Sequence, residues 1–221
     1  MAMRARSMTL PAMALTLTVM VLGPFCWLSQ AARADNVEEA FVQQSAGKTL
    51  AILKDKALSS SDKHARMHDL MSSLLDLKRM AMFTLGPAAH TASPTDLDLY
   101  VRAYSDFALA NYAAELTTYM GQSLQVTGSA QRAKGDFIVN AEVIDPNDKA
   151  DGPTAVSFRV LDEGGGQLAL VDASVAGIWF TLAQRDDFSG FLSQNGGDIS
   201  KLAAHLNDLS AHPKPAARTN P

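Results

Sequence analysis

Cysteine occurs only once among the 221 residues, at Cys26. A single cysteine excludes an internal disulfide framework and a multi-cysteine metal site. The chain also has only one long apolar run, Leu10–Leu28, so it lacks the pattern of a multi-span membrane protein. Acidic residues are absent before Asp35. Tyrosine is confined to one segment, because all four tyrosines lie between Tyr100 and Tyr119.

The N-terminal segment has the pattern of a secretory signal. Arg4 and Arg6 precede the apolar run, and small residues at Ala32 and Ala34 follow it. A basic start, an apolar stretch and an A-x-A site predict cleavage after Ala34, with residues 1–34 as a signal peptide. An uncleaved anchor is the alternative, because the run approaches the ~18–20 residues that a spanning helix needs. A cleaved signal predicts an exported protein.

The remaining chain is acidic and large enough for one domain. The full sequence has 19 basic and 23 acidic residues, and three of the arginines precede Asp35. The mature net charge is therefore −7 with neutral histidines, which disfavours nucleic acid as a partner. Residues 35–210 are expected to form a single domain with a substantial core. The polar, proline-rich stretch 211–221 is expected to be a disordered tail.

The first half of this domain has helical periodicity. Apolar residues at Val37, Ala40, Phe41, Leu50 and Leu53 predict a first helix. Residues 60–85 continue as helix, and Gly86–Pro87 ends them.

The tyrosine-containing segment begins with a capping box. In "SPTD", Ser93 is the predicted N-cap, Pro94 the first helical residue and Asp96 the N3 residue. Apolar residues then recur at steps of three and four as far as Tyr119. This pattern predicts one long helix, whose aromatic face either forms core or lines a cavity for an apolar ligand.

After Gly121 the apolar period changes to two, which predicts strands. "DFIVNAEVI", "AVSFRVLD" and "LALVDASVAGI" alternate, "SLQVTGSAQR" is a weaker strand, and "EGGGQ" is a hairpin loop. Ala169, Val171, Ala173 and Val175 are expected on one face of their strand. Residues 178–194 and a segment capped by Asp198 predict two final helices. The pattern is that of an α+β fold in which helices cover an antiparallel sheet.

Residues for catalysis or metal binding do not form a recognisable motif. His64 and His68 are spaced as in zinc-binding helices, but Ala65 stands where the metalloprotease pattern requires glutamate. We therefore predict no enzyme activity, no catalytic residues, no metal site and no cofactor.

The order of several short motifs resembles the MlaC, or toluene-tolerance auxiliary, family. The motifs are "LGPAAHTASPTDLDLYVRAYSDFALANYAAELTTYMGQ", "VIDPN", "VSFRV", "LVDASVAGI" and "QRDDFSGFLSQNGGDISKLAAHL". They cover roughly Val37 to Leu209. Members of this family are periplasmic phospholipid-binding components of the Mla lipid-transport system, and a related branch is associated with hopanoid biosynthesis.

The resemblance implies a twisted sheet and helices that enclose an apolar cavity for acyl chains. It also implies two partners: an inner-membrane ABC transporter with an MCE-domain subunit, and an outer-membrane lipoprotein–porin complex. The matching helix and the inner sheet face would then line the lipid site. The ten predicted lipid-binding residues are Phe83, Tyr100, Tyr104, Phe107, Val139, Val143, Phe158, Val171, Val175 and Ile178.

Three functions therefore stay open at the level of sequence. The first is a carrier that shuttles phospholipid between inner- and outer-membrane complexes, with a hopanoid-type lipid as the alternative cargo. The second is a non-carrier adaptor of the same fold, whose core is filled by its own side chains. The third is a periplasmic enzyme without a recognisable motif.

Overall fold

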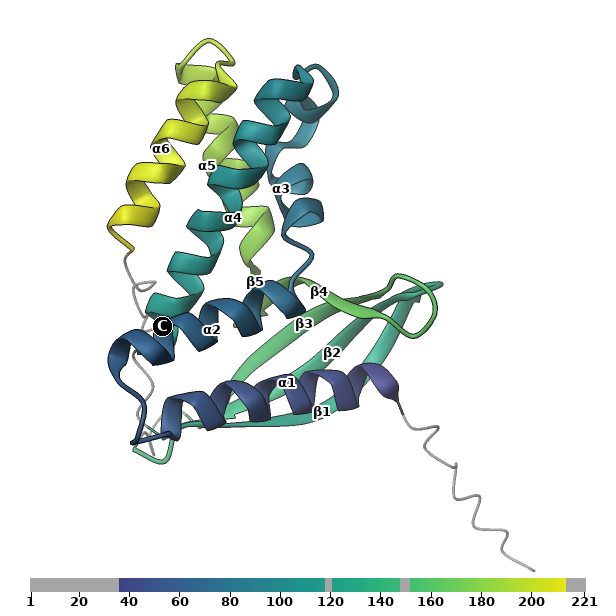
Figure 1. Ribbon diagram of the computed structural model, residues 1–221. Coiled ribbons are helices and arrows are strands. Elements are labelled where there is room, and N and C mark those ends of the chain that lie inside the picture. Colours follow the sequence, from purple (N-terminus) through teal and green to yellow (C-terminus); the bar gives the residue numbers. More distant parts are fainter. Residues whose placement is uncertain (1–35, 118–120, 148–151, 214–221) are drawn as a thin grey trace, which may run out of the picture. The chain divides into compact units, whose positions relative to one another are not determined.

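The computed structural model describes residues 36–117, 121–147 and 152–213 (Figure 1). The predicted signal peptide and residues 214–221 of the predicted tail lie outside these residues. The helices are α1 (Val37–Lys54), α2 (Ser60–Leu74), α3 (Leu77–Leu85), the 3-10 helix η1 (Gly86–His90), α4 (Pro94–Thr117), α5 (Phe180–Gln194) and α6 (Ile199–Ala211). The strands are β1 (Ser123–Ala133), β2 (Asp136–Ile144), β3 (Thr154–Asp162), β4 (Leu168–Val175) and β5 (Ile178–Trp179).

The five strands form one antiparallel sheet in the order β1-β2-β3-β4-β5. This arrangement, with helices around the sheet, confirms the α+β prediction. Strand β5 was not expected, because residues 178–194 were predicted to be wholly helical. Ile178 and Trp179 instead turn back along β4, and the helix begins at Phe180. The turn between the two strands uses Gly177 at φ 82° and Ala176 at φ 49°, a conformation in which a residue with a Cβ is uncommon.

Apolar side chains from neighbouring strands gather on one face of the sheet. Val139 pairs with Phe158, and Ala141 pairs with Val156 on one side and Val126 on the other. Helix α1 covers part of this face, because Val42 packs with Val139 and Val160. We call it the α1 face. Val37, in contrast to the sequence-based expectation, is 63% exposed and contributes nothing to this contact.

The predicted alternation along β4 is wrong because the strand contains a bulge. Phe158 pairs with Ala173, but Val160 pairs with Leu170, so the register shifts by one residue between the two pairs. Ala173 and Val175 therefore lie on the α1 face, as expected, whereas Leu170 replaces Ala169 there. Val171 is the extra residue of the bulge and has no paired residue across the strands.

Helices α3, α4, α5 and α6 lie in one group (Figure 1). A second group of apolar side chains is buried among them. The predicted start of α4 is confirmed, since Ser93 Oγ accepts a hydrogen bond from the Asp96 backbone N–H at 3.1 Å. Asp198 caps α6 in the same way, accepting from the Lys201 N–H at 3.1 Å. These caps satisfy backbone donors that a helix start leaves unpaired.

The break between α2 and α3 attaches the helices to the sheet. Leu75 forms a parallel bridge with Leu170, and the Asp76 backbone N–H donates to the Leu170 carbonyl oxygen at 3.0 Å. The Asp76 carboxylate then caps α3 through the Arg79 N–H at 2.9 Å and also accepts from Arg79 Nε at 2.8 Å. Burial opposes ionisation of Asp76, but the hydrogen bonds from Arg79 outweigh it and lower the pKa of the carboxyl.

Candidate functional site

The ten predicted lipid-binding residues lie in several different environments. Tyr100 and Tyr104 are buried within the helical cluster, and Phe107 packs at its margin. Val139 and Phe158 belong to the separate cluster that joins α1 to the sheet. The two clusters share no residue within the described ranges. The helical core and the apolar sheet face are therefore two distinct apolar groups.

Tyr100 and Tyr104 are enclosed by the protein's own side chains. Both are 0% exposed, and Phe188 meets their rings edge-on at centroid distances of 6.5 and 6.4 Å. The Tyr100 hydroxyl lies 2.8 Å from Thr84 Oγ1, and the Tyr104 hydroxyl donates to Gln184 Oε1 at 2.9 Å. Burial raises the pKa of both phenols above the ordinary value.

The α1 face becomes progressively more accessible toward the end at which β2 and β4 stop. Val139 is fully covered, whereas Val143, farther along β2, is only partly buried. Val175 is 39% exposed, and its paired residue Ile178 is 57% exposed. We call this region the open end of the sheet, and three of the predicted residues belong to it: Val143 on β2, Val175 on β4 and Ile178 on β5. Single exposed apolar residues are ordinary, but Val175 and Ile178 are paired and continue a buried apolar face.

Helix α5 begins beside the open end and is fixed to the sheet by Asp172. The Asp172 carboxylate accepts from the Thr181 backbone N–H at 3.1 Å and from the Thr181 hydroxyl at 2.6 Å. Leu182, in the first turn of α5, is exposed like its neighbour Ile178. The sequence analysis did not select Leu182, because the position of this turn beside β4 depends on the unexpected strand β5.

The two predicted residues not yet described, Phe83 and Val171, do not lie at the open end. Phe83 lies on α3 and is 37% exposed, with the Arg185 guanidinium carbon 5.1 Å from the centroid of its ring. This geometry is a cation–π contact between α3 and α5. Val171, in the β4 bulge, is 6% exposed and belongs to neither apolar cluster.

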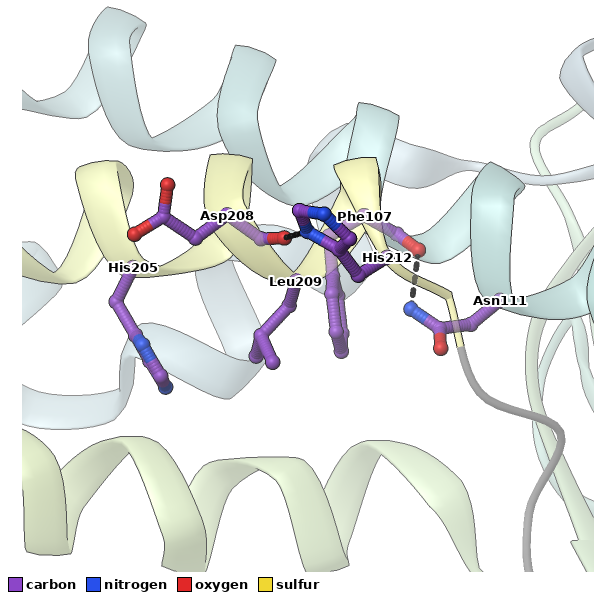
Figure 2. A pocket seen from close by; sticks show the side chains of 6 residues that line it. All are labelled: Phe107, Asn111, His205, Asp208, Leu209 and His212. Atoms are coloured by element: carbon purple, nitrogen blue, oxygen red, sulfur yellow. Dashed lines mark hydrogen bonds between the residues drawn. The ribbon is translucent and has the colours of Figure 1, made fainter.

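A pocket of about 300 Å³ lies between α4 and α6 (Figure 2). Its lining consists of Phe107, Asn111, His205, Asp208, Leu209 and His212. Two of its polar groups are bonded within their own helices: Asn111 Nδ2 donates to the Phe107 carbonyl at 2.7 Å, and His212 Nδ1 lies 3.2 Å from the Asp208 carbonyl. Phe107 is the one predicted lipid-binding residue in this lining, and the volume is at the lower limit of ~300–1,000 Å³ for ligand sites.

The described residues include no group of three or more side chains that could hold a metal ion. None of the helices in the described ranges is long and apolar enough to cross a membrane. The candidate site consists of the exposed apolar residues of the open end and of the hydrogen bonds between Asp172 and Thr181 beside it.

The architecture and the open apolar end define the class of this molecule as an α+β domain with an accessible apolar sheet face. Residues 43–208 match the family described as MlaC protein. The chain belongs to the MlaC family, as the order of its motifs predicted. No curated protein sequence matches it.

A solved structure with a similar fold comes from Ralstonia solanacearum and is described as a phospholipid-binding protein in complex with a phospholipid. The TM-score is 0.66 and the sequence identity 20%, over 78% of this chain and 96% of that chain. At this identity the likeness establishes the common fold.

Proposed function

We propose that this protein is a periplasmic phospholipid carrier that holds acyl chains against the α1 face of the sheet. The observation that carries the proposal is the change in exposure along this face, from fully covered Val139 to exposed Val175 and Ile178. A continuous apolar surface that starts in the interior and ends in solvent suits a ligand with a long apolar part and a polar end. MlaC-family membership and a shared fold with a phospholipid-binding protein support the same function.

The energetics of acyl chains determine how such a carrier has to work. Two acyl chains contain about thirty methylenes in total. Their transfer from water to an apolar environment is favourable by ~24 kcal/mol, at about 0.8 kcal/mol for each methylene. An apolar site and a bilayer both supply a stabilisation of this size. Release into water is therefore too slow for transport, and the lipid has to pass directly to a docked partner.

The partners in this proposal are two membrane complexes. The family resemblance suggests an inner-membrane ABC transporter with an MCE-domain subunit and an outer-membrane lipoprotein–porin complex. A carrier that binds lipid without an energy source shuttles in whichever direction its partners impose. ATP hydrolysis by the transporter would supply the direction.

A non-carrier adaptor is the second candidate, and the helical cluster is the observation that favours it. Tyr100 and Tyr104 are covered by protein side chains, and both of their hydroxyls have protein partners. This half of the molecule is thus filled as an adaptor would be. The carrier proposal depends on the sheet face and its open end, so the lipid content of the protein separates the two candidates.

Native mass spectrometry of the protein purified from the periplasm tests the proposal. We expect a mass increase that corresponds to about one bound lipid, and extraction followed by lipid analysis identifies it. A phospholipid supports the proposed cargo, whereas a hopanoid-type lipid supports the alternative cargo. A lipid-free mass, combined with no uptake from phospholipid vesicles, would favour the adaptor and contradict the carrier.

Introducing a charge at the open end is expected to weaken lipid binding. In Ile178→Asp, a carboxylate would lie beside the acyl chains, and a poorly solvated polar group costs about 2 kcal/mol, or roughly 30-fold in affinity. Val37→Asp is the matched control, because Val37 is also exposed but lies at the start of α1. Vesicle-uptake assays measure both variants. Equal uptake by the two variants would place the lipid away from Ile178.

A further inference from the structure

Tyr112 differs from the other tyrosines in how its hydroxyl is bonded. Three tyrosine side chains lie in the described ranges, and the hydroxyls of Tyr100 and Tyr104 both have hydrogen-bond partners. The Tyr112 side chain makes a ring contact with Phe180, at 6.5 Å between centroids, and its hydroxyl has no hydrogen bond to any residue in those ranges. A donor that lies away from bulk water normally has a partner, so this hydroxyl requires an explanation.

Tyr112 is both deep in the fold and accessible. Burial raises the pKa of its phenol well above the ordinary value of 10.0, and the negative charge of Asp172 raises it further. The side chain nevertheless keeps part of its surface uncovered. A side chain that is deep but not covered by its neighbours faces space that a ligand or water can enter.

The position of Tyr112 relates this space to the open end of the sheet. Its partner Phe180 is the first residue of α5 and directly follows β5. Strand β5 contains Ile178, which pairs with Val175 at the open end. Tyr112 therefore lies at the boundary where the helical cluster ends and the accessible part of the sheet begins.

We propose that the Tyr112 hydroxyl donates a hydrogen bond to an ester carbonyl oxygen of the bound lipid. The proposal rests on the lipid binding proposed above and adds the polar contact that fixes how far the lipid enters. Ester carbonyls stand where acyl chains join the glycerol unit, so a donor at the boundary of an apolar site meets them there. The phenol is protonated at neutral pH and donates, as this contact requires.

The charge of Asp172 favours an ester over a phosphate as the acceptor. An anionic phosphate near this carboxylate would be repelled, whereas a neutral carbonyl oxygen would not. The Asp172 carboxylate itself already accepts hydrogen bonds from Thr181 and from the Ala173 backbone N–H at 2.8 Å. These hydrogen bonds hold the carboxylate in place, and its negative charge acts on the Tyr112 phenol.

Binding of three lipids to the delipidated full protein tests the contact. The probes are a dioleoyl phosphatidylethanolamine, its diether analogue without ester carbonyls, and dioleoylglycerol without phosphate. We expect Tyr112→Phe to bind the two ester lipids about fivefold to tenfold more weakly than the native protein, the usual effect of one lost hydrogen bond. The native protein should bind the diether lipid more weakly than the ester lipid by a similar factor. Tyr112→Phe should bind the diether lipid as strongly as the native protein does.

Tyr100→Phe is the matched control, because that hydroxyl is bonded to Thr84 inside the core. It should bind all three lipids as the native protein does. If Tyr112→Phe does not fold, equal binding of the ester and ether lipids by the native protein would still contradict the contact.

Three results would overturn the inference. Unchanged binding of all three lipids by Tyr112→Phe would mean that the hydroxyl is hydrated. If Tyr112→Phe bound both phosphatidylethanolamines more weakly, the ester and the diether form alike, but bound dioleoylglycerol normally, the hydroxyl would be assigned to the phosphate. Failure of the native protein to bind any of the three would contradict the carrier function itself, and with it the contact.

Discussion

Ala173→Trp is expected to abolish lipid loading while the protein stays folded. Ala173 lies on the α1 face of β4 opposite Phe158, and its side chain is only partly covered. If acyl chains lie against this face, an indole at residue 173 occupies the volume that the lipid needs. The alternative is that protein side chains already fill this volume, in which case the added atoms cost about 1–3 kcal/mol of stability through overpacking.

The matched control is Ala155→Trp on the other face of the sheet. Ala155 precedes Val156 on β3, so its side chain points away from the α1 face, and it is exposed. Lipid uptake from vesicles and thermal unfolding are measured for both variants. Normal lipid uptake by Ala173→Trp would show that this face is not the binding site. The same conclusion would follow if the variant were much less stable but its folded fraction still took up lipid.

Tyr104→Ala is expected to lower the free energy of unfolding by about 3–5 kcal/mol, the range for removing a large aromatic side chain from a core. The ring is fully buried and packs near Tyr100, Phe107 and Phe188, at centroid distances of 6.1, 6.4 and 6.4 Å. The substitution also leaves the Gln184 amide without its donor. Such a loss is a large part of the ~5–15 kcal/mol that stabilises a typical domain.

Urea unfolding monitored by circular dichroism measures this loss. Tyr104→Phe is the control, because it keeps the ring and removes only the hydroxyl, and we expect about 1 kcal/mol for the lost hydrogen bond. A cost below about 1 kcal/mol for Tyr104→Ala would mean that the ring is not packed as protein core. A lipid-lining role for Tyr104 would then be the better explanation of its burial.

Local sequence patterns predicted most elements, because their signals act over a few residues. The Ser93–Asp96 box sets the start of α4, and Asp198 sets the start of α6. Alternating residues predicted β1 to β4. The α+β class and the MlaC family followed from the same local patterns and their order.

Features that depend on a partner far along the chain were not predicted. The bulge in β4 and the two-residue strand β5 exist only relative to neighbouring strands. Alternation alone therefore misassigned Ala169, and the helix predicted at residues 178–194 was expected to start two residues too early. Similarly, the tyrosine pattern on α4 fits both a packed core and a cavity wall. Gln184 and Phe188 decide this for Tyr104, and they lie some eighty residues away.

The sequence by itself therefore determined most of the helices and strands, the family, and the apolar character of one sheet face. Only the tertiary structure decided which apolar residues are covered: Tyr100 and Tyr104 by α5, Val139 by α1, and Val175 and Ile178 by little of the described protein. The physical reason is that the spacing of apolar residues indicates only which face of a helix or strand is shielded from water. Whether protein or ligand provides the cover depends on elements that meet only after folding.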